Sequence, residues 1–316
     1  MKNVLVTGSN GLVGSALKST QSPEANVFFA NRMHGDLRKE EHVKRLFEMA
    51  EPTHVIHTAA RVGGIGGNKS NHGSFFYDNI LINAHVIEAC RVYNVKKLLA
   101  FSSVCVFPDN LATLQEDKMH DGPAYESNFA YAYAKRMVDV QIQAYKSQYG
   151  IENYCSIIPG NIFGKHDMYD LQAGHVIPML LHKLYLAKQN NTSFNIWGDG
   201  KSLREFLYVE DLAKILWKLI FVVENIPDRL IISGNKQYSI REVVDILVNI
   251  SNFSSEVIWE TNKPNGQRSR PTDQSKLHKI LSNYNIEYTS LKDGLKQSWD
   301  WLTQNYPNVR QSYHNY

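Results

Sequence analysis

The amino-acid sequence predicts an α/β fold, in which a doubly wound parallel sheet is followed by a smaller C-terminal α/β domain. Three observations predict it. Short apolar runs alternate with helical patterns through the first half of the chain, as in parallel strands joined by helices. The first run meets a glycine-rich turn, and the alternation stops after Gly164. We expect one domain over residues 1–165, with a returning segment near 205–232, and a second over residues 166–316.

The strands of the predicted sheet are apolar runs of three to five residues. They are residues 4–6, 27–30, 54–57, 97–101 and 154–158. Helical spacing of apolar residues indicates the helices between them. These are residues 39–49, 80–93 and 131–149, the last ending at Gly150. Ligands of such sheets collect at the carboxyl ends of the strands, so polar groups just after a strand are the first site candidates.

The second half of the chain is expected to hold fewer regular elements. A helix is predicted over residues 177–188. Residues 206–212 suggest a short strand and a helix that return to the first domain. Residues 239–316 are expected to form two helices and the basic loop 267–271.

Composition and charge exclude several classes of function. The 316 residues are 43% hydrophobic, and the net charge is +3. The sequence has no long basic run, so nucleic acid is not the expected partner. No stretch approaches the ~18 apolar residues of a membrane span, and Met1 leads directly into a core strand rather than a signal peptide. The three cysteines are an odd number without metal-type spacing, which predicts reduced thiols in a cytoplasmic protein and no metal site.

The glycine-rich turn after the first strand predicts a dinucleotide site of the Rossmann type. Its glycines follow the spacing G-x-x-G-x-x-G and open onto a helix. Such glycines permit a tight turn, close approach of the backbone to a pyrophosphate, and helix–strand packing. The diphosphate then lies on free N–H groups at the positive end of the helix dipole. The residues expected to bind it are Gly8, Ser9, Asn10, Gly11, Leu12, Val13 and Gly14.

A tyrosine and a lysine one helical turn apart supply a candidate proton donor. Tyr131 and Lys135 share a helix face, and an ammonium beside a phenol lowers the phenol pKa from ~10. Ser103 follows the fourth strand and can hold a substrate carbonyl beside Tyr131. Alternatively, Tyr131 and Lys135 are two surface residues on a helix, and Ser103 bonds its own turn. We expect Ser102 rather than Ser103 to bond the turn.

The residues after the second and third strands bear on the choice of cofactor. No carboxylate follows the second strand, where a free ribose 2′-hydroxyl usually finds one, whereas Arg32 could meet a 2′-phosphate. We therefore expect NADPH, with Arg32 as either a cofactor ligand or a solvated charge. Ala59 and Ala60 are small enough to let the cofactor lie close to the backbone.

Together these features resemble the GDP-L-fucose synthase family of the extended short-chain dehydrogenase/reductases, almost from end to end. The VGGI loop and the GHVIP segment are its most specific motifs. The matching segments are TGSNGLVG at 7–14, PTHVIHTAARVGGI at 52–65, SSVCVFP at 102–108, SNFAYAYAKRM at 127–137, PGNIFGKHD at 159–167, GHVIPMLLHK at 174–183 and WGDGKSLREFLYVEDLA at 197–213.

The resemblance implies an NADPH-dependent 4-reductase that is also a 3,5-epimerase, converting GDP-4-keto-6-deoxymannose to GDP-L-fucose. Cys105 takes the position of the epimerisation base and His175 that of the acid, although each alone could be a core or helix-capping residue. The pairing is chemically consistent, because a ketone at C4 acidifies the hydrogens at C3 and C5. The resemblance also implies further cofactor ligands, namely Asp36, Leu37, Asn161 and His175. The implied substrate ligands are Val62, Gly63, Gly64, Lys183, Trp197, Arg204 and Arg270.

Three departures from the family pattern leave alternatives open. Val104 replaces a Ser or Thr, Lys165 replaces a proline, and Met168-Tyr169 replaces an Asn-Phe pair. A GDP-4-keto-6-deoxy-heptose substrate and loss of the epimerase activity therefore compete with the main hypothesis. An NADP-sensing regulatory protein is a non-enzyme alternative. A dehydratase or C4 epimerase is disfavoured, because Val104-Cys105 stands where dehydratases carry Asp-Glu. The family also implies a homodimer built from helices 80–93 and 131–149.

Overall fold

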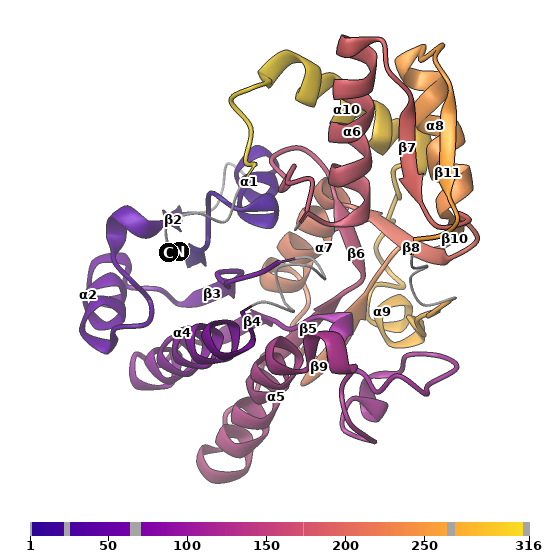
Figure 1. Ribbon diagram of the computed structural model, residues 1–316. Helices are drawn as coiled ribbons and strands as arrows, with labels where there is room; N and C mark the ends of the chain where they lie inside the picture. Colours follow the sequence, from indigo (N-terminus) through magenta and orange to yellow (C-terminus); the bar gives the residue numbers. More distant parts are fainter. Residues whose placement is uncertain (1, 22–25, 64–70, 173, 264–268, 312–316) are drawn as a thin grey trace.

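The main sheet of the protein is a six-stranded parallel sheet with strand order β2-β1-β3-β4-β5-β9 (Figure 1). The computed structural model describes residues 2–21, 26–63, 71–172, 174–263 and 269–311. The strands of this sheet are β1 (Asn3–Thr7), β2 (Asn26–Ala30), β3 (His54–His57), β4 (Lys97–Phe101), β5 (Tyr154–Pro159) and β9 (Arg229–Ile232).

Helices cover both faces of the main sheet. Side chains of β4 alternate between the two faces, with Leu98 in one apolar cluster and Leu99 in the other. One face packs against α1 (Leu12–Ser19), α7 (Val209–Phe221) and α9 (Ser275–Ile280). The other packs against α2 (Glu40–Ala50), α4 (His72–Val92) and α5 (Phe129–Tyr149). Because helices cover both faces, ligands can reach the main sheet at the carboxyl ends of its strands.

The remaining strands and helices pack around a second apolar core. A three-stranded sheet has the order β10-β8-β6, and two further strands, β11 and β7, pair with each other. These strands are β6 (Asn161–Phe163), β7 (Phe194–Trp197), β8 (Leu203–Tyr208), β10 (Gln237–Ser239) and β11 (Val257–Glu260). The helices packed around this core are α6 (Val176–Asn190), α8 (Ile240–Ser251) and α10 (Leu291–Asn305). Short 3-10 turns are η1 (Arg32–His34), η2 (Val104–Val106), η3 (Glu116–Lys118) and η4 (Glu126–Asn128).

The structure confirms the alternating strands of the first half and corrects three details. The helix expected from residue 80 begins at His72, because its first turns bury Asp78 and Asn79 through tertiary bonds to Arg61 rather than through an apolar pattern. The strand expected near 206 lies in the small sheet as β8, and β9 is the sixth strand of the main sheet. The C-terminal region holds α8, α9, α10 and β11, rather than two helices.

The division of the chain at residues 165 and 166 stays a prediction. β6 precedes that division and pairs with β8 in the small sheet, whereas α9 follows it and packs against the main sheet. In the part of the chain that the structure describes, every helix is too short or too polar to cross a membrane.

Candidate active site

The glycine-rich turn has the geometry of a phosphate cradle. Gly8 adopts a φ of 72°, and the Gly11 N–H donates to the Gly8 carbonyl at 2.9 Å. A Cβ on Gly14 would meet the Gly8 carbonyl oxygen at 2.4 Å and the Ser9 Cα at 2.5 Å, so the helix start lies directly on the turn. The N-cap residue of α1 is Gly11, which has no side chain to cap the first turn, so the N–H groups of that turn are open to a ligand.

The polar and small residues around this turn also fit a dinucleotide. The Ser9 hydroxyl is buried and has no hydrogen-bond partner among the described residues, so a diphosphate oxygen could satisfy it. A Cβ on Gly8 would lie 2.8 Å from the Ala59 backbone, which brings the end of β3 against the turn. Ala60 follows at this edge and is half-buried. Leu12 and Val13 direct their side chains into the core, so only their backbones remain for a ligand.

Three of the residues expected to bind the cofactor, Arg32, Asp36 and Leu37, follow β2. Arg32 is exposed at the start of η1. Asp36 is engaged by Arg38, whose guanidinium lies 2.7 Å from the carboxylate and holds the pKa of Asp36 below its usual value. The Leu37 side chain packs against the core, and its carbonyl accepts from His85 at 3.2 Å. The Asn10 side-chain oxygen accepts a bond from Lys18 nearby.

The expected proton donor lies on α5, against the end of β4. Tyr131 is 9% exposed and Lys135 is 1% exposed. The Lys135 ammonium donates to the Phe101 carbonyl at 2.8 Å, and burial lowers the pKa of Lys135 to about 7. The helix is fixed to the strand end by Ser102, whose hydroxyl donates to the Lys135 carbonyl at 3.3 Å. These two bonds fix Lys135, and with it this turn of α5, at the edge of the sheet where the strands end.

Ser103 rather than Ser102 bonds its own turn. The prediction from sequence, which gave this role to Ser102, was wrong. The Ser103 Oγ accepts from the Cys105 N–H at 3.2 Å and caps η2. Its hydroxyl proton stays available for a second partner, because an accepting hydroxyl can still donate. The Val106 carbonyl accepts from Arg136 on α5 at 2.7 Å, which holds η2 against that helix. Ser103 therefore remains a candidate to donate to a carbonyl beside Tyr131.

The burial of Lys135 predicts a pH-dependent stability of the ligand-free protein. The unfolded chain keeps this lysine protonated up to about pH 10.4, whereas the folded state releases the proton near pH 7. Between these values the unfolded state binds more protons, so stability rises with pH by up to about 1.4 kcal/mol per unit. Lys135→Met is expected to remove this rise and to stabilise the protein most below pH 7. Urea unfolding at pH 6.5 and 9 would measure it.

Lys39→Met provides the control for this measurement, since it removes an exposed lysine at the start of α2. It should leave the pH dependence of stability as in the wild type. An unchanged slope in Lys135→Met would contradict the buried-ammonium interpretation.

Cys105 is half-buried in η2, close to Arg270. Arg270 donates to the Pro108 carbonyl at 2.8 Å, and burial lowers the pKa of its guanidinium. Arg204 on β8 is partly buried too, and its pKa is lowered by burial and then by the charge of Arg270. Arg270 thus lies near both the thiol and Arg204, and two guanidiniums in one place favour an anionic ligand. The other cysteines, Cys90 and Cys155, are fully buried core residues as expected, and burial raises the pKa of both thiols.

The remaining predicted residues fall into three groups. His175 is the exposed N-cap residue of α6, and the Asn161 amide donates to the Glu205 carbonyl at 2.9 Å. Lys183 lies over the half-exposed Trp197 ring, 5.0 Å from its centroid, so these two form a unit. Val62 and Gly63 follow β3 and are half-buried, and Gly64 lies outside the described residues.

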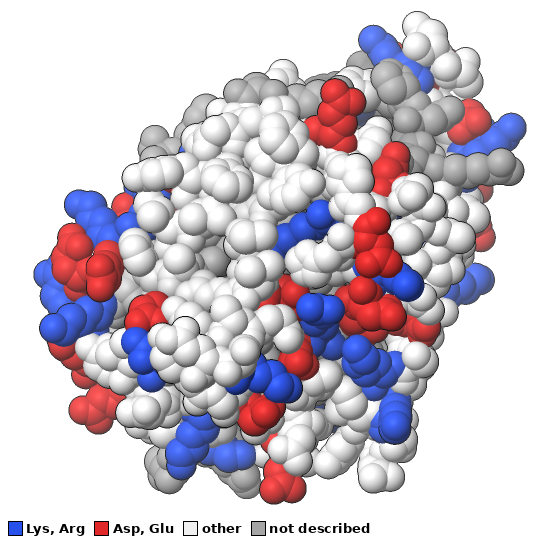
Figure 2. All heavy atoms as spheres, turned by 90° about the horizontal axis from the view of Figure 1, so that it is seen from below, with Lys and Arg blue, Asp and Glu red and all other residues white. Residues whose placement is uncertain are grey.

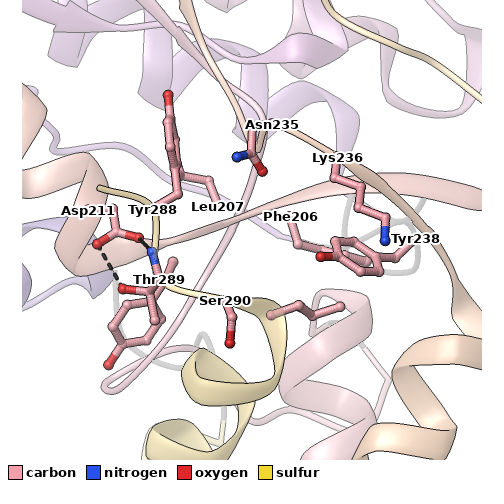
Figure 3. Close-up of a pocket in the computed structure, with 11 residues that line it drawn as sticks. Phe206, Leu207, Asp211, Asn235, Lys236, Tyr238, Tyr288, Thr289 and Ser290 are labelled. Atoms are coloured by element: carbon pink, nitrogen blue, oxygen red, sulfur yellow. Dashed lines mark hydrogen bonds between the residues drawn. The ribbon is translucent and has the colours of Figure 1, made fainter. Parts of the chain in front are cut away.

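A pocket of about 480 Å³ lies elsewhere, between β8 and the segment before α10 (Figure 3). Figure 3 shows the Asp211 carboxylate turned toward Thr289, whose N–H and hydroxyl donate to it at 2.7 and 2.9 Å. None of the residues predicted for the site lines this pocket. The candidate site is therefore defined by the strand ends and not by this pocket.

Sequence reasoning missed Glu205, which fixes the segment that follows Arg270. Glu205 on β8 accepts from the Ser233 hydroxyl, and from the Thr272 N–H at 3.1 Å and hydroxyl at 2.6 Å. Because Arg204 and Glu205 are adjacent in β8, the Thr272 bonds bring the segment with Arg270 beside Arg204. The only sequence signal was the Arg-Glu pair inside the SLREF motif.

A phosphate cradle, a buried lysine beside a tyrosine, and a serine at a strand end define an extended short-chain dehydrogenase/reductase. The model of the NAD dependent epimerase/dehydratase family matches residues 4–233. The chain is 39% identical over 315 residues to the GDP-L-fucose synthase of Dictyostelium discoideum, covering 98% of each chain. It therefore belongs to the NAD dependent epimerase/dehydratase family and, within it, to the GDP-L-fucose synthase family.

Two solved structures are similar over nearly the whole chain. A GDP-L-fucose synthetase from Naegleria fowleri bound to NADP has a TM-score of 0.91 and 35% identity, covering 98% of this chain and 95% of that one. A GDP-6-OMe-4-keto-L-xylo-heptose reductase from Campylobacter jejuni has a TM-score of 0.84 and 25% identity, covering 96% and 98%.

Proposed function

We propose that this protein is an NADPH-dependent 4-reductase and 3,5-epimerase that converts GDP-4-keto-6-deoxymannose to GDP-L-fucose. The observation that carries the proposal is the buried Lys135 under Tyr131 at the end of β4, next to the turn of Ser103 and Cys105. This one group of residues therefore offers a proton donor, a hydrogen-bond donor to the ketone oxygen and a candidate base.

The reduction uses Tyr131, Lys135 and Ser103. Bound NADPH would supply the hydride to C4 of the sugar. Ser103 donates a hydrogen bond to the C4 oxygen, and Tyr131 gives that oxygen a proton as negative charge develops on it. Lys135, fixed on the Phe101 carbonyl, stabilises the phenolate that remains and bonds the ribose hydroxyls of the cofactor.

Epimerisation uses Cys105 and His175 before reduction. The Cys105 thiolate removes a proton from carbon next to the ketone, and the electron pair moves onto the C4 oxygen. Ser103 and Tyr131 stabilise that enolate through hydrogen bonds. His175 then delivers a proton to the opposite face, which inverts the configuration. The same pair acts at C3 and at C5.

The nucleotide and the cofactor are recognised by positive charge and by one exposed ring. Arg204 and Arg270 bind the diphosphate, because the positive charge of Arg270 acts on Arg204 and an anion between them relieves that repulsion. The exposed Trp197 indole, with Lys183 over it, offers a surface on which the base can stack. Arg32 meets the 2′-phosphate of NADPH, consistent with the NADP bound by the Naegleria fowleri relative.

A GDP-4-keto-6-deoxy-heptose is the second candidate substrate, because the heptose reductase from Campylobacter jejuni has the same fold. One of the three departures that suggested it, Met168-Tyr169, lies in the core. Tyr169 is fully buried and stacks on Trp301 at 5.9 Å, and Met168 is buried as well. These residues affect packing rather than contact with a sugar, which favours deoxymannose. Of the other two departures, Lys165 pairs with Glu210 on α7 at 3.1 Å, and Val104 is half-buried in η2, near the proposed sugar position.

We further propose a cytoplasmic homodimer formed through α4 and α5. These helices pack along each other and expose large apolar side chains, which a second copy would cover. Seen from the side of these helices, the surface carries a wide uncharged area beside charged groups (Figure 2). The exposed apolar residues of the two helices are Phe76, Tyr77, Val92, Phe129, Met137, Val140 and Tyr149.

The function is tested by incubating the protein with GDP-4-keto-6-deoxymannose and NADPH in deuterated water. We expect loss of absorbance at 340 nm and, by proton NMR, deuterium at C3 and C5 of the product. No turnover with this substrate but turnover with the heptose analogue would select the second candidate. No turnover with either would favour an NADP-sensing protein.

Cys105→Ser separates the two activities. A hydroxyl is a far weaker base than a thiolate, so solvent exchange at C3 and C5 should fall about 10²- to 10⁴-fold. Reduction of the ketone should be spared, because Tyr131 and Lys135 are untouched. The measurement is deuterium incorporation alongside NADPH oxidation. Cys155→Ser, in the core strand β5, is the control for loss of a thiol. Equal loss of both activities in Cys105→Ser would contradict the division of roles.

A further inference from the structure

His175 needs an orienting partner that its own helix does not supply. It precedes α6 as the N-cap residue, its carbonyl accepts from the Met179 N–H at 3.0 Å, and its side chain makes no cap hydrogen bond. The side chain is exposed. An imidazole can present either ring nitrogen, and the hydrogen bond made by one nitrogen decides which proton the other carries. An acid that must act on one face of a sugar therefore depends on a fixed second contact.

The candidate for that partner is Asp167, in the loop before α6. The carboxyl group is buried, and its Oδ1 accepts from the Met168 N–H at 2.7 Å. Its Oδ2 is buried with no hydrogen-bond partner among the described residues, an arrangement that is unfavourable for a buried acceptor. Burial raises the pKa of Asp167 to about 6, and the His175 imidazole opposes this rise more than Arg310 does.

The backbone brings the two residues together. The Gly174 N–H donates to the Asp170 carbonyl at 3.1 Å. A Cβ on Gly174 would lie 2.4 Å from the Asp170 carbonyl oxygen and 2.9 Å from that of Met168. The residue before His175 is thus packed on the residue after Asp167, and any side chain at position 174 would force the two apart.

We propose that Asp167 is a positioning residue for His175: its Oδ2 accepts the N–H of one imidazole nitrogen and turns the other nitrogen toward the sugar. This rests on the proposed function, in which His175 delivers the proton. During that delivery the proton leaves the sugar-facing nitrogen, the enolate electron pair forms the new C–H bond, and the Asp167 contact is retained. The imidazole returns to neutral in a single tautomer, ready for the next proton from solvent.

Asp167→Asn tests the proposal, because an amide keeps the volume and can still accept from Met168. The first readout is the ¹⁵N spectrum of the His175 ring, assigned by its loss in His175→Gln. We expect one neutral tautomer in the wild type and a mixture of both in Asp167→Asn. A mixture in the wild type, or an unchanged tautomer in the variant, would overturn the proposal. This readout needs no substrate, so it stands apart from failure of the proposed function.

The second readout is deuterium exchange at C3 and C5 of the keto sugar, with NADP⁺ and no reductant. Asp167→Asn should slow exchange about 10²-fold, as expected for a displaced catalytic group. It should add little in a His175→Gln background, because the two residues act as one unit. Independent losses that multiply would count against the pair. Asp170→Asn, a carboxyl group three residues along the same loop, is the matched control and should retain wild-type exchange.

Discussion

Tyr131→Phe is expected to lower the rate of NADPH oxidation about 10²- to 10⁴-fold, the range contributed by a positioned general acid. The phenyl ring would occupy the same largely buried space on α5, so the fold and the cofactor site should survive. Only the hydroxyl that we propose as the proton donor to the C4 oxygen is lost. Lys135 and Ser103 remain in place, so substrate binding should change much less than kcat.

The measurement is steady-state oxidation of NADPH at 340 nm with GDP-4-keto-6-deoxymannose. Tyr133→Phe is a matched control on the same helix, because the Tyr133 ring packs under the Arg136 guanidinium at 5.0 Å rather than over Lys135. It should retain nearly full activity. Equal losses in the two variants would show that the helix, and not the Tyr131 hydroxyl, is the sensitive feature.

Gly14→Ala is expected to lower the free energy of unfolding by about 3 kcal/mol, or to prevent folding. The added Cβ would meet the Gly8 carbonyl oxygen at 2.4 Å and two Ser9 backbone atoms within 2.7 Å, and none of these atoms can rotate away. The start of α1 would have to move off the turn, and overpacking of this kind costs ~1–3 kcal/mol or more. Urea unfolding of the ligand-free protein would measure the loss.

Gly11→Ala serves as the comparison within the same turn. Its Cβ would meet only the Gly8 carbonyl oxygen, at 3.2 Å, so the fold should persist with a small loss of stability. The methyl group would instead stand where the cofactor diphosphate approaches, so NADPH should bind more weakly in a fluorescence titration. If Gly14→Ala were as stable as Gly11→Ala, the close packing of helix on turn would not matter to this fold.

The alternating strands and helices of the first half could be predicted from sequence, because both periodicity and turn residues report on burial locally. The helix before residue 80 could not be. Its first turns bury Asp78, whose carboxylate pairs with Arg38 and Arg61 at 3.1 and 2.7 Å. A buried ion pair between distant residues carries no periodic signal, so the amphipathic pattern begins only later along α4.

Sequence alone determined which residue types can do the chemistry: the glycines of the turn, Tyr131 one helical turn before Lys135, and Ser103 after a strand. These are short-range patterns, set by backbone geometry and helical spacing. Only the tertiary structure decided that Arg270 lies beside Arg204, through the bonds of Glu205 to Thr272. It also decided that Asp167 is buried near His175, with one oxygen unsatisfied. Both arrangements join residues through packing and desolvation, which depend on the whole fold and leave no mark in a local pattern.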